Sequence, residues 1–73
     1  MKTIMNELLN NYCEAYQQFD INYMRIVTNK DIRIDIKINN KKSITLINAD
    51  TNEITNILNI NTLIPALKLK KWI

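Results

Sequence analysis

Few side chains of this 73-residue chain could perform catalytic chemistry. The sequence has no histidine, which excludes imidazole acid–base catalysis and catalytic Ser-His or Cys-His pairs. Its single cysteine, Cys13, has no second thiol for a disulfide and no histidine to activate it. Glu7 and Glu14 share one arc of a predicted helix, but seven residues separate them by about 10 Å along its axis, farther than paired hydrolytic carboxylates usually lie. We therefore expect no catalytic residue, no metal site and no cofactor, and predict that the protein is not an enzyme.

Glycine is also absent, which removes several nucleotide- and RNA-binding motifs. The P-loop, the dinucleotide-binding GxGxxG turn and the KH-type GxxG loop all depend on glycine, because the backbone there must approach the ligand closely or adopt positive φ. Binding to phosphates would therefore depend on cationic side chains alone.

The cations are concentrated in the middle of the chain. Residues 21–48 hold six basic residues against two acidic ones, a charge of +4, whereas residues 1–20 have a charge of −2. Lysine and arginine side chains can neutralise phosphates, and an aromatic ring such as that of Tyr23 can stack on a base. The candidate nucleic-acid contacts are Arg25, Arg33, Lys37, Lys41 and Lys42.

A three-strand meander is predicted to carry these cations. The segment DIRIDIKI, residues 31–38, places isoleucine at every second position, the pattern of a half-buried strand. Residues 21–28 and 43–48 are rich in β-branched and aromatic residues and are predicted to be its neighbours. The short TNKD and NNKK connections imply antiparallel pairing, with Asn39 and Asn40 suited to positive φ.

An amphipathic helix is predicted to cover one side of this sheet. From Thr3 to Phe19 the apolar residues recur with helical spacing, and they include Leu8, Leu9, Tyr12 and Tyr16. These residues are expected to contact the isoleucines of the meander.

The second half of the chain allows alternatives. Residues 51–60 fit a fourth strand or a short helix capped by Thr51, and we slightly favour the strand because of its β-branched residues. The tail TLIPALKLKKWI, residues 62–73, fits a final helix with Pro65 near its start, or an edge strand over ALKLKKW, residues 66–72. The sequence thus predicts a single small α+β domain over residues 1–73: an N-terminal helix on an antiparallel meander of three or four strands, closed by a short helix or an edge strand.

Strand alternation predicts a mixed outer sheet face. If the isoleucines of residues 31–38 face the helix, the charged residues between them lie on the outer face. Apolar side chains of the neighbouring strands lie on that outer face too. Apolar residues on an open sheet surface tend to mark contact sites. The candidate partner-binding residues are Tyr23, Arg25, Val27, Arg33, Lys37 and Ile47. Three interpretations remain open: a solvated face with cross-strand salt bridges over which the C-terminal segment folds, a protein-binding surface that includes homodimerisation, and a nucleic-acid surface.

A short chain rich in asparagine and isoleucine, ordered as a helix followed by a three-strand meander, resembles several small phage-encoded inhibitors, including some anti-CRISPR proteins. This resemblance implies a non-enzymatic protein, encoded by a phage or plasmid, that inhibits or modulates a host protein. The lone cysteine and the polar interruptions near the N-terminus indicate a cytoplasmic protein without a secretory signal, and membrane binding is not expected. The alternative function is a small basic RNA- or DNA-binding module that uses the outer sheet face.

Overall fold

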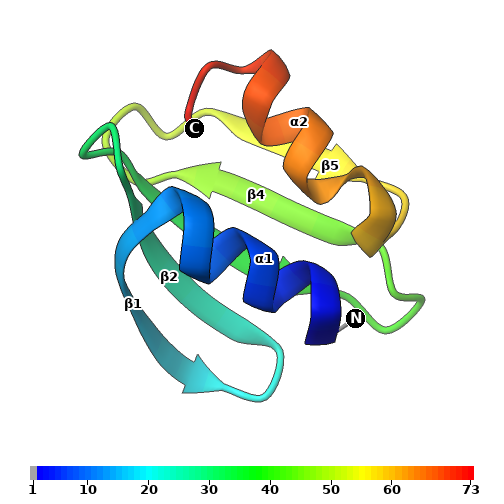
Figure 1. Cartoon of the computed structure of the whole chain (residues 1–73). Helices are drawn as coiled ribbons and strands as arrows, with labels where there is room; N and C mark the ends of the chain where they lie inside the picture. The colour runs from blue at the N-terminus through cyan, green and yellow to red at the C-terminus, as the bar shows by residue number, and fades with distance from the viewer. Residues whose placement is uncertain (1) are drawn as a thin grey trace.

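The computed structural model describes residues 2–73 as a five-stranded antiparallel sheet with two helices on one side. Helix α1 (Lys2–Tyr12) comes first and helix α2 (Leu63–Leu69) comes near the end (Figure 1). The strands are joined in sequence order, β1-β2-β3-β4-β5, so each pairs with the next along the chain. Their bounds are β1 Cys13–Asp20, β2 Tyr23–Thr28, β3 Arg33–Ile38, β4 Ile44–Asn48 and β5 Ile54–Ile57. The α+β prediction is confirmed, with five strands in place of three or four.

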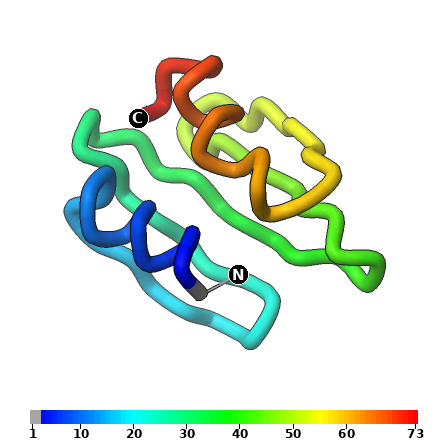
Figure 2. The backbone as a smooth tube through the Cα atoms, turned by 45° about the vertical axis from the view of Figure 1, so that its right-hand side comes forward, coloured from blue at the N-terminus to red at the C-terminus, as the bar shows by residue number. Residues whose placement is uncertain are grey.

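The core lies between the sheet and the two helices. Alternate residues of β2 and β4 are buried, as the period-two pattern predicts, and in β3 Ile34 and Ile36 are buried together with Asp35 between them. Helix α1 contributes Leu8, which is fully buried, and the C-terminal region contributes Trp72. The buried apolar residues are Leu8, Met24, Ile26, Ile34, Ile36, Ile44, Leu46, Ile57, Leu63, Ile64, Leu67 and Trp72. Figure 2 shows both helices lying across the same side of the sheet.

The prediction of one helix over residues 3–19 is wrong beyond Tyr12, because the chain passes directly from α1 into strand β1. Asn10 and Asn11 are poor helix formers, and the carbonyls that end the helix are satisfied from another element. Asn29 donates its side-chain amide to the Asn11 carbonyl over 3.2 Å and its backbone N–H to the Tyr12 carbonyl over 2.8 Å. Pairing with β2 then satisfies one side of the β1 backbone.

The open alternatives in the second half of the chain are resolved. Residues 54–57 form strand β5, as the favoured alternative predicted, and a short 3-10 helix at Ile60–Thr62 follows. Residues 63–69 form a helix and not an edge strand. Pro65 lies in the first turn of α2, where its missing N–H would have no intrahelical acceptor.

The hairpin turns use positive φ, but mostly not at asparagine. Each of the turns after β2 and β3 has one left-handed residue: Asp31 has φ 62° and Lys42 has φ 66°. Lys42 donates its backbone N–H to the Asn39 carbonyl, as expected for a type I turn followed by a left-handed residue. The expectation that Asn39 and Asn40 would take positive φ is therefore wrong. Asn52, with φ 65°, is the asparagine that does so.

Candidate functional site: the outer sheet face

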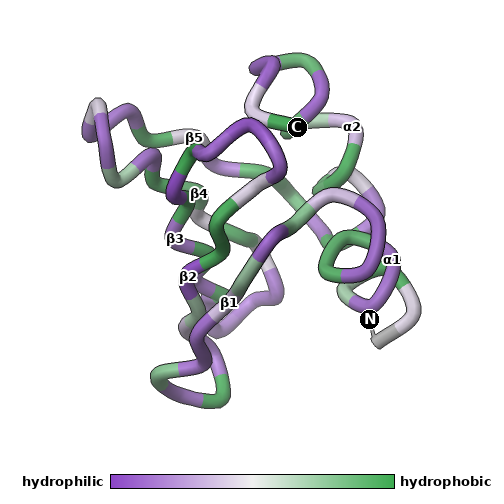
Figure 3. Tube along the Cα trace, turned by 60° about the vertical axis from the view of Figure 1, so that its left-hand side comes forward, coloured by the Kyte–Doolittle hydropathy of each residue, from purple (hydrophilic) through white to green (hydrophobic). Residues whose placement is uncertain are grey.

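The outer face is the side of the sheet away from α1 and α2. Figure 3 shows the sheet nearly edge-on, with both helices on one side and the other side not covered by any described element. The C-terminal segment does not fold over this face, because α2 and Trp72 pack into the core on the helix side. The outer face is therefore a surface available for contact in the described chain.

Cross-strand register arranges the outer face in rows. The middle row crosses all five strands, because each of its members pairs with the next: Gln17, Arg25, Asp35, Ile47 and Ile54. The row on one side of it contains Ala15, Val27 and Arg33. The row on the other side contains Tyr23, Lys37, Thr45 and Asn56.

A buried carboxylate fixes the centre of this face. Asp35 is only 7% exposed although it lies on the side away from the core. Arg25 donates Nε to one carboxylate oxygen over 2.5 Å and Nη2 to the other over 3.1 Å, and the Tyr23 hydroxyl donates over 3.2 Å. The arginine hydrogen bonds lower the pKa of Asp35 below its ordinary value, although burial acts in the opposite direction. The three side chains form a cross-strand network that is pre-organised.

A second ion pair lies at one end of the sheet. Arg33 donates from Nε and Nη2 to one oxygen of Asp50, over 3.1 and 2.6 Å, and its backbone N–H contacts the other oxygen over 3.3 Å. These hydrogen bonds lower the pKa of Asp50. Both side chains stay partly exposed, at 58% and 34%, so the pair is a surface ion pair that contributes little to stability.

Aromatic side chains gather at the opposite end. The rings of Phe19 and Tyr23 lie 4.9 Å apart between centroids, and the Lys37 ammonium lies 5.0 Å from the centre of the Tyr23 ring. The latter distance is typical of a cation–π contact. Phe19 remains 46% exposed. This end of the face combines an aromatic surface with one cation.

The apolar part of the face lies across β4 and β5. Ile47 and Ile54 are direct cross-strand neighbours, and Ile54 is 61% exposed. Val27, two strands away, is half-buried and pairs with Arg33. The exposed Ile54 and its half-buried neighbour Ile47 form an apolar patch beside the fixed charges of Arg25 and Asp35.

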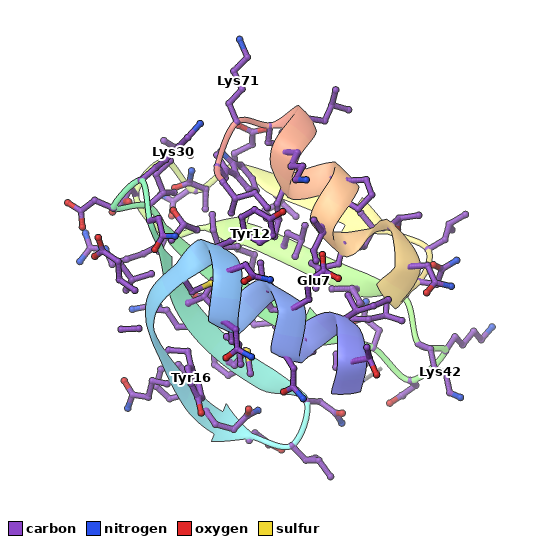
Figure 4. All side chains as sticks on the ribbon, viewed as in Figure 1. Glu7, Tyr12, Tyr16, Lys30, Lys42 and Lys71 are labelled. Atoms are coloured by element: carbon purple, nitrogen blue, oxygen red, sulfur yellow. The ribbon has the colours of Figure 1, made fainter. Side chains whose placement is uncertain are left out.

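The six predicted partner-binding residues all lie on this face. Tyr23, Arg25 and Val27 come from β2, Arg33 and Lys37 from β3, and Ile47 from β4. The five predicted nucleic-acid contacts are not brought together. Lys41 and Lys42 lie in the turn after β3, whereas Arg33 begins that strand, so about 17 Å of strand separates them. In Figure 4, Lys42 lies at the opposite end of the molecule from Lys30 and Lys71.

Other residues of the face were not predicted as site residues. Asp35 was expected to face outward as a charged residue, and it does lie on the outer face. Its burial was not predicted, because it depends on the strand register that places Asp35 between Arg25 and Ile47. Ile54 was in the segment left open between strand and helix, and Phe19 was assigned to the helix. If residues 54–57 form a strand, the three-residue spacing of Ile54 and Ile57 puts them on opposite faces, and this spacing was the available signal for Ile54.

Cys13 is not an activated nucleophile. It lies at the start of β1, packed against the core, and its burial raises its thiol pKa to about 11. The reactive thiolate is therefore scarce at neutral pH. Within residues 2–73, no group of three or more histidine, cysteine, aspartate or glutamate side chains is placed to hold a metal ion.

Comparisons with protein-family models, with curated proteins and with solved structures find no match for this chain. Neither helix of the described residues combines the length and apolar character needed to cross a membrane.

Proposed function

We propose that this chain is a small, non-enzymatic cytoplasmic protein that binds a larger protein through its outer sheet face and so inhibits or modulates it. The observation that carries the proposal is the apolar pair Ile47–Ile54 beside the fixed Arg25–Asp35 pair, on a face that no described element covers. Protein interfaces typically combine an apolar centre with hydrogen-bonded charged groups, and arginine and aromatic residues are enriched in them.

The size of the molecule fits this role. Its extents are 30 × 25 × 24 Å, so one face projects to on the order of 600–750 Å², close to the roughly 800 Å² that each partner buries in a standard interface. A rigid sheet face also loses little conformational entropy on binding, because Asp35 and Arg25 already hold each other. The proposal includes an origin in a phage or plasmid, with a host protein as the target.

The ion pairs favour protein over nucleic acid as the partner. Of the cations on the face, Arg25 is paired with Asp35 and Arg33 with Asp50, and Lys37 contacts the Tyr23 ring. Each arginine would have to give up or share its carboxylate to neutralise a phosphate. The face thus carries three cations against two anions and lacks the cationic stripe of a typical nucleic-acid surface.

Affinity capture from a host lysate, with quantification by mass spectrometry, tests the proposal. The wild-type chain is compared with Ile47→Asp, which places a charge in the apolar patch, and with Leu69→Asp, which changes an 84% exposed leucine of α2 on the helix side of the sheet. We expect a protein that is captured by the wild type and by Leu69→Asp but lost with Ile47→Asp. Capture unaffected by Ile47→Asp would refute the role of the face.

Binding to mixed single- and double-stranded oligonucleotides is measured in parallel at about 50 and 200 mM salt. The proposal predicts no binding that depends on Arg33 or Lys37. Binding that falls by orders of magnitude with salt and is abolished by charge reversal at Arg33 and Lys37 would identify the protein as a nucleic-acid-binding module instead.

A further inference from the structure

Strand β1 is an edge of the sheet with one side of its backbone unpaired in the described chain. It pairs with β2 alone, and every residue after Cys13 is exposed. Figures 1 and 2 show it at the border of the sheet, beside α1. Natural edge strands are usually protected from pairing with other chains by lysine, proline, bulges or short length. β1 is eight residues long and contains neither lysine nor proline, whereas β5 at the opposite edge has four residues.

The protection that β1 does have lies at its ends. The register with β2 shifts between Cys13 and Ala15 and again between Gln18 and Asp20, which makes Glu14 and Phe19 the bulged residues. The two acidic residues, Glu14 and Asp20, also lie at the ends. Between them, residues 15–18 keep regular pairing and carry no charge. This central segment can accept another strand.

An apolar groove lies on the helix side of the same edge. It has a volume of about 390 Å³ between α1, β1 and the turn that follows β1, and no charged residue lines it. Tyr16 belongs to both features, because it is at the centre of the β1 edge and also lines the groove, and it is 58% exposed. Figure 4 shows Tyr16 beside β1 at this border of the sheet. The groove is lined by Met5, Asn6, Leu9, Tyr16, Gln18, Ile21, Asn22, Tyr23, Met24, Ile36 and Ile38.

We propose that β1 pairs antiparallel with β1 of a second copy, about a twofold axis through Tyr16, to give a continuous ten-stranded sheet with all helices on one side. In such a sheet, directly opposed residues point to the same face. Tyr16 points to the helix side, so it must oppose another helix-side residue of the copy, which is Tyr16 or Gln18 in the regular segment.

Charge decides between these two registers. Opposing Tyr16 to Gln18 of the copy would bring the bulged end at Glu14 beside Asp20 of the other chain, twice by symmetry, and like charges close together across paired strands destabilise a sheet. Opposing Tyr16 to Tyr16 brings the bulged end at Glu14 beside the neutral Gln18 of the copy and sets the two exposed rings side by side at the rims of the two grooves. The second register therefore combines backbone hydrogen bonds, aromatic contact and no like-charge pair. Because edge pairing buries less than a standard interface, we expect a weak dimer that forms only at high protein concentration.

Sedimentation equilibrium from about 5 to 500 µM tests the dimer. The wild type should shift from monomer to dimer over this range, and Tyr16→Lys should remain monomeric, because it places two ammonium groups opposite each other on the axis. The matched control, Leu69→Lys, changes an 84% exposed leucine on α2 and should dimerise like the wild type. Circular dichroism of each variant establishes that it is folded.

Cross-linking tests the register. In a Cys13→Ser background, Tyr16→Cys should form a disulfide-linked dimer under mild oxidation, since residues on the axis lie within disulfide distance of their copies. The control Leu69→Cys in the same background should not form it at the same rate. A monomeric wild type at 500 µM, dimerisation retained in Tyr16→Lys, or equal cross-linking of both cysteine variants would overturn the proposal. Ile47→Asp, which lies on the outer face and not at the β1 edge, should leave the dimer intact. The proposal of a dimer and the proposal of an outer-face interface can therefore be refuted separately.

Discussion

An isoleucine-to-alanine truncation should destabilise the protein strongly on the core face of the sheet and hardly at all on the outer face. Ile36 lies at the centre of β3, is 1% exposed, and pairs with Met24 and Leu46. Removing a buried isoleucine to alanine costs about 2–5 kcal/mol, through lost burial and the cavity left behind. A domain of this size is stable by roughly 3–5 kcal/mol, so Ile36→Ala should leave a measurable fraction unfolded at 25 °C without denaturant. Ile54→Ala, on the outer face at 61% exposure, should change the free energy of unfolding by about 0.5 kcal/mol or less.

Urea denaturation followed by the fluorescence of Trp72 measures both variants. Trp72 is the only tryptophan and is 6% exposed among the core residues, so its emission should shift to longer wavelength on unfolding. The expected result is a midpoint near zero urea for Ile36→Ala and a midpoint close to the wild type for Ile54→Ala. Equal destabilisation by the two truncations would mean that the outer face is covered in the native protein, and the assignment of that face as a contact surface would be wrong.

Three further predictions concern individual side chains. Asp35→Asn should lower the free energy of unfolding at pH 7, and its difference from the wild type in urea titrations should shrink below about pH 4. The pKa of Asp35 is depressed in the native protein, so its stabilising contribution is complete above the unfolded pKa of 3.8 and is lost as the pH falls through the native pKa. A difference that stays constant with pH would contradict the ion pair. Alkylation of Cys13 at pH 8 should be roughly tenfold or more slower in the folded protein than in urea, because burial raises its thiol pKa from 9.0 to about 11 and so lowers the thiolate fraction. Equal rates measured by mass spectrometry would disprove its burial. Lys42→Gly should raise the free energy of unfolding by about 0.5–1 kcal/mol, since glycine tolerates φ 66°, while the neighbouring control Lys41→Gly, which is not at positive φ, should give no such gain in thermal denaturation.

The sheet and its buried face were predictable from the sequence because strand alternation is a local signal. Ile34 and Ile36 had to share a face with alternate residues of the strands paired to them, whatever the details of the turns. All six proposed contact residues followed from the same alternation. The left-handed position at Lys42 could not be predicted from alternation, because the type of loop determines which residue takes positive φ. The composition of this loop instead favoured Asn39 or Asn40.

The end of α1 was not predictable from periodicity. Tyr16 and Phe19 continue the helical apolar stripe, yet both lie in β1 and remain more than 40% exposed. The competing signals were the weak helix propensity of Asn10 and Asn11 and the demand of the β2 edge for a pairing partner, which depends on the tertiary structure. Asp35 shows the same limit, since its burial requires Arg25 and Tyr23 to converge from a neighbouring strand.

The most direct test of the outer face as a protein interface is the affinity of the captured partner for matched variants. Titration calorimetry at about 150 mM salt would compare the wild type with Ile47→Asp and with Leu69→Asp. A charge introduced at the centre of the contact should weaken binding by 10-fold or more, equivalent to about 1.4 kcal/mol, while the control on α2 should bind like the wild type. Unchanged affinity for Ile47→Asp, or an equal loss for Leu69→Asp, would contradict the proposed interface.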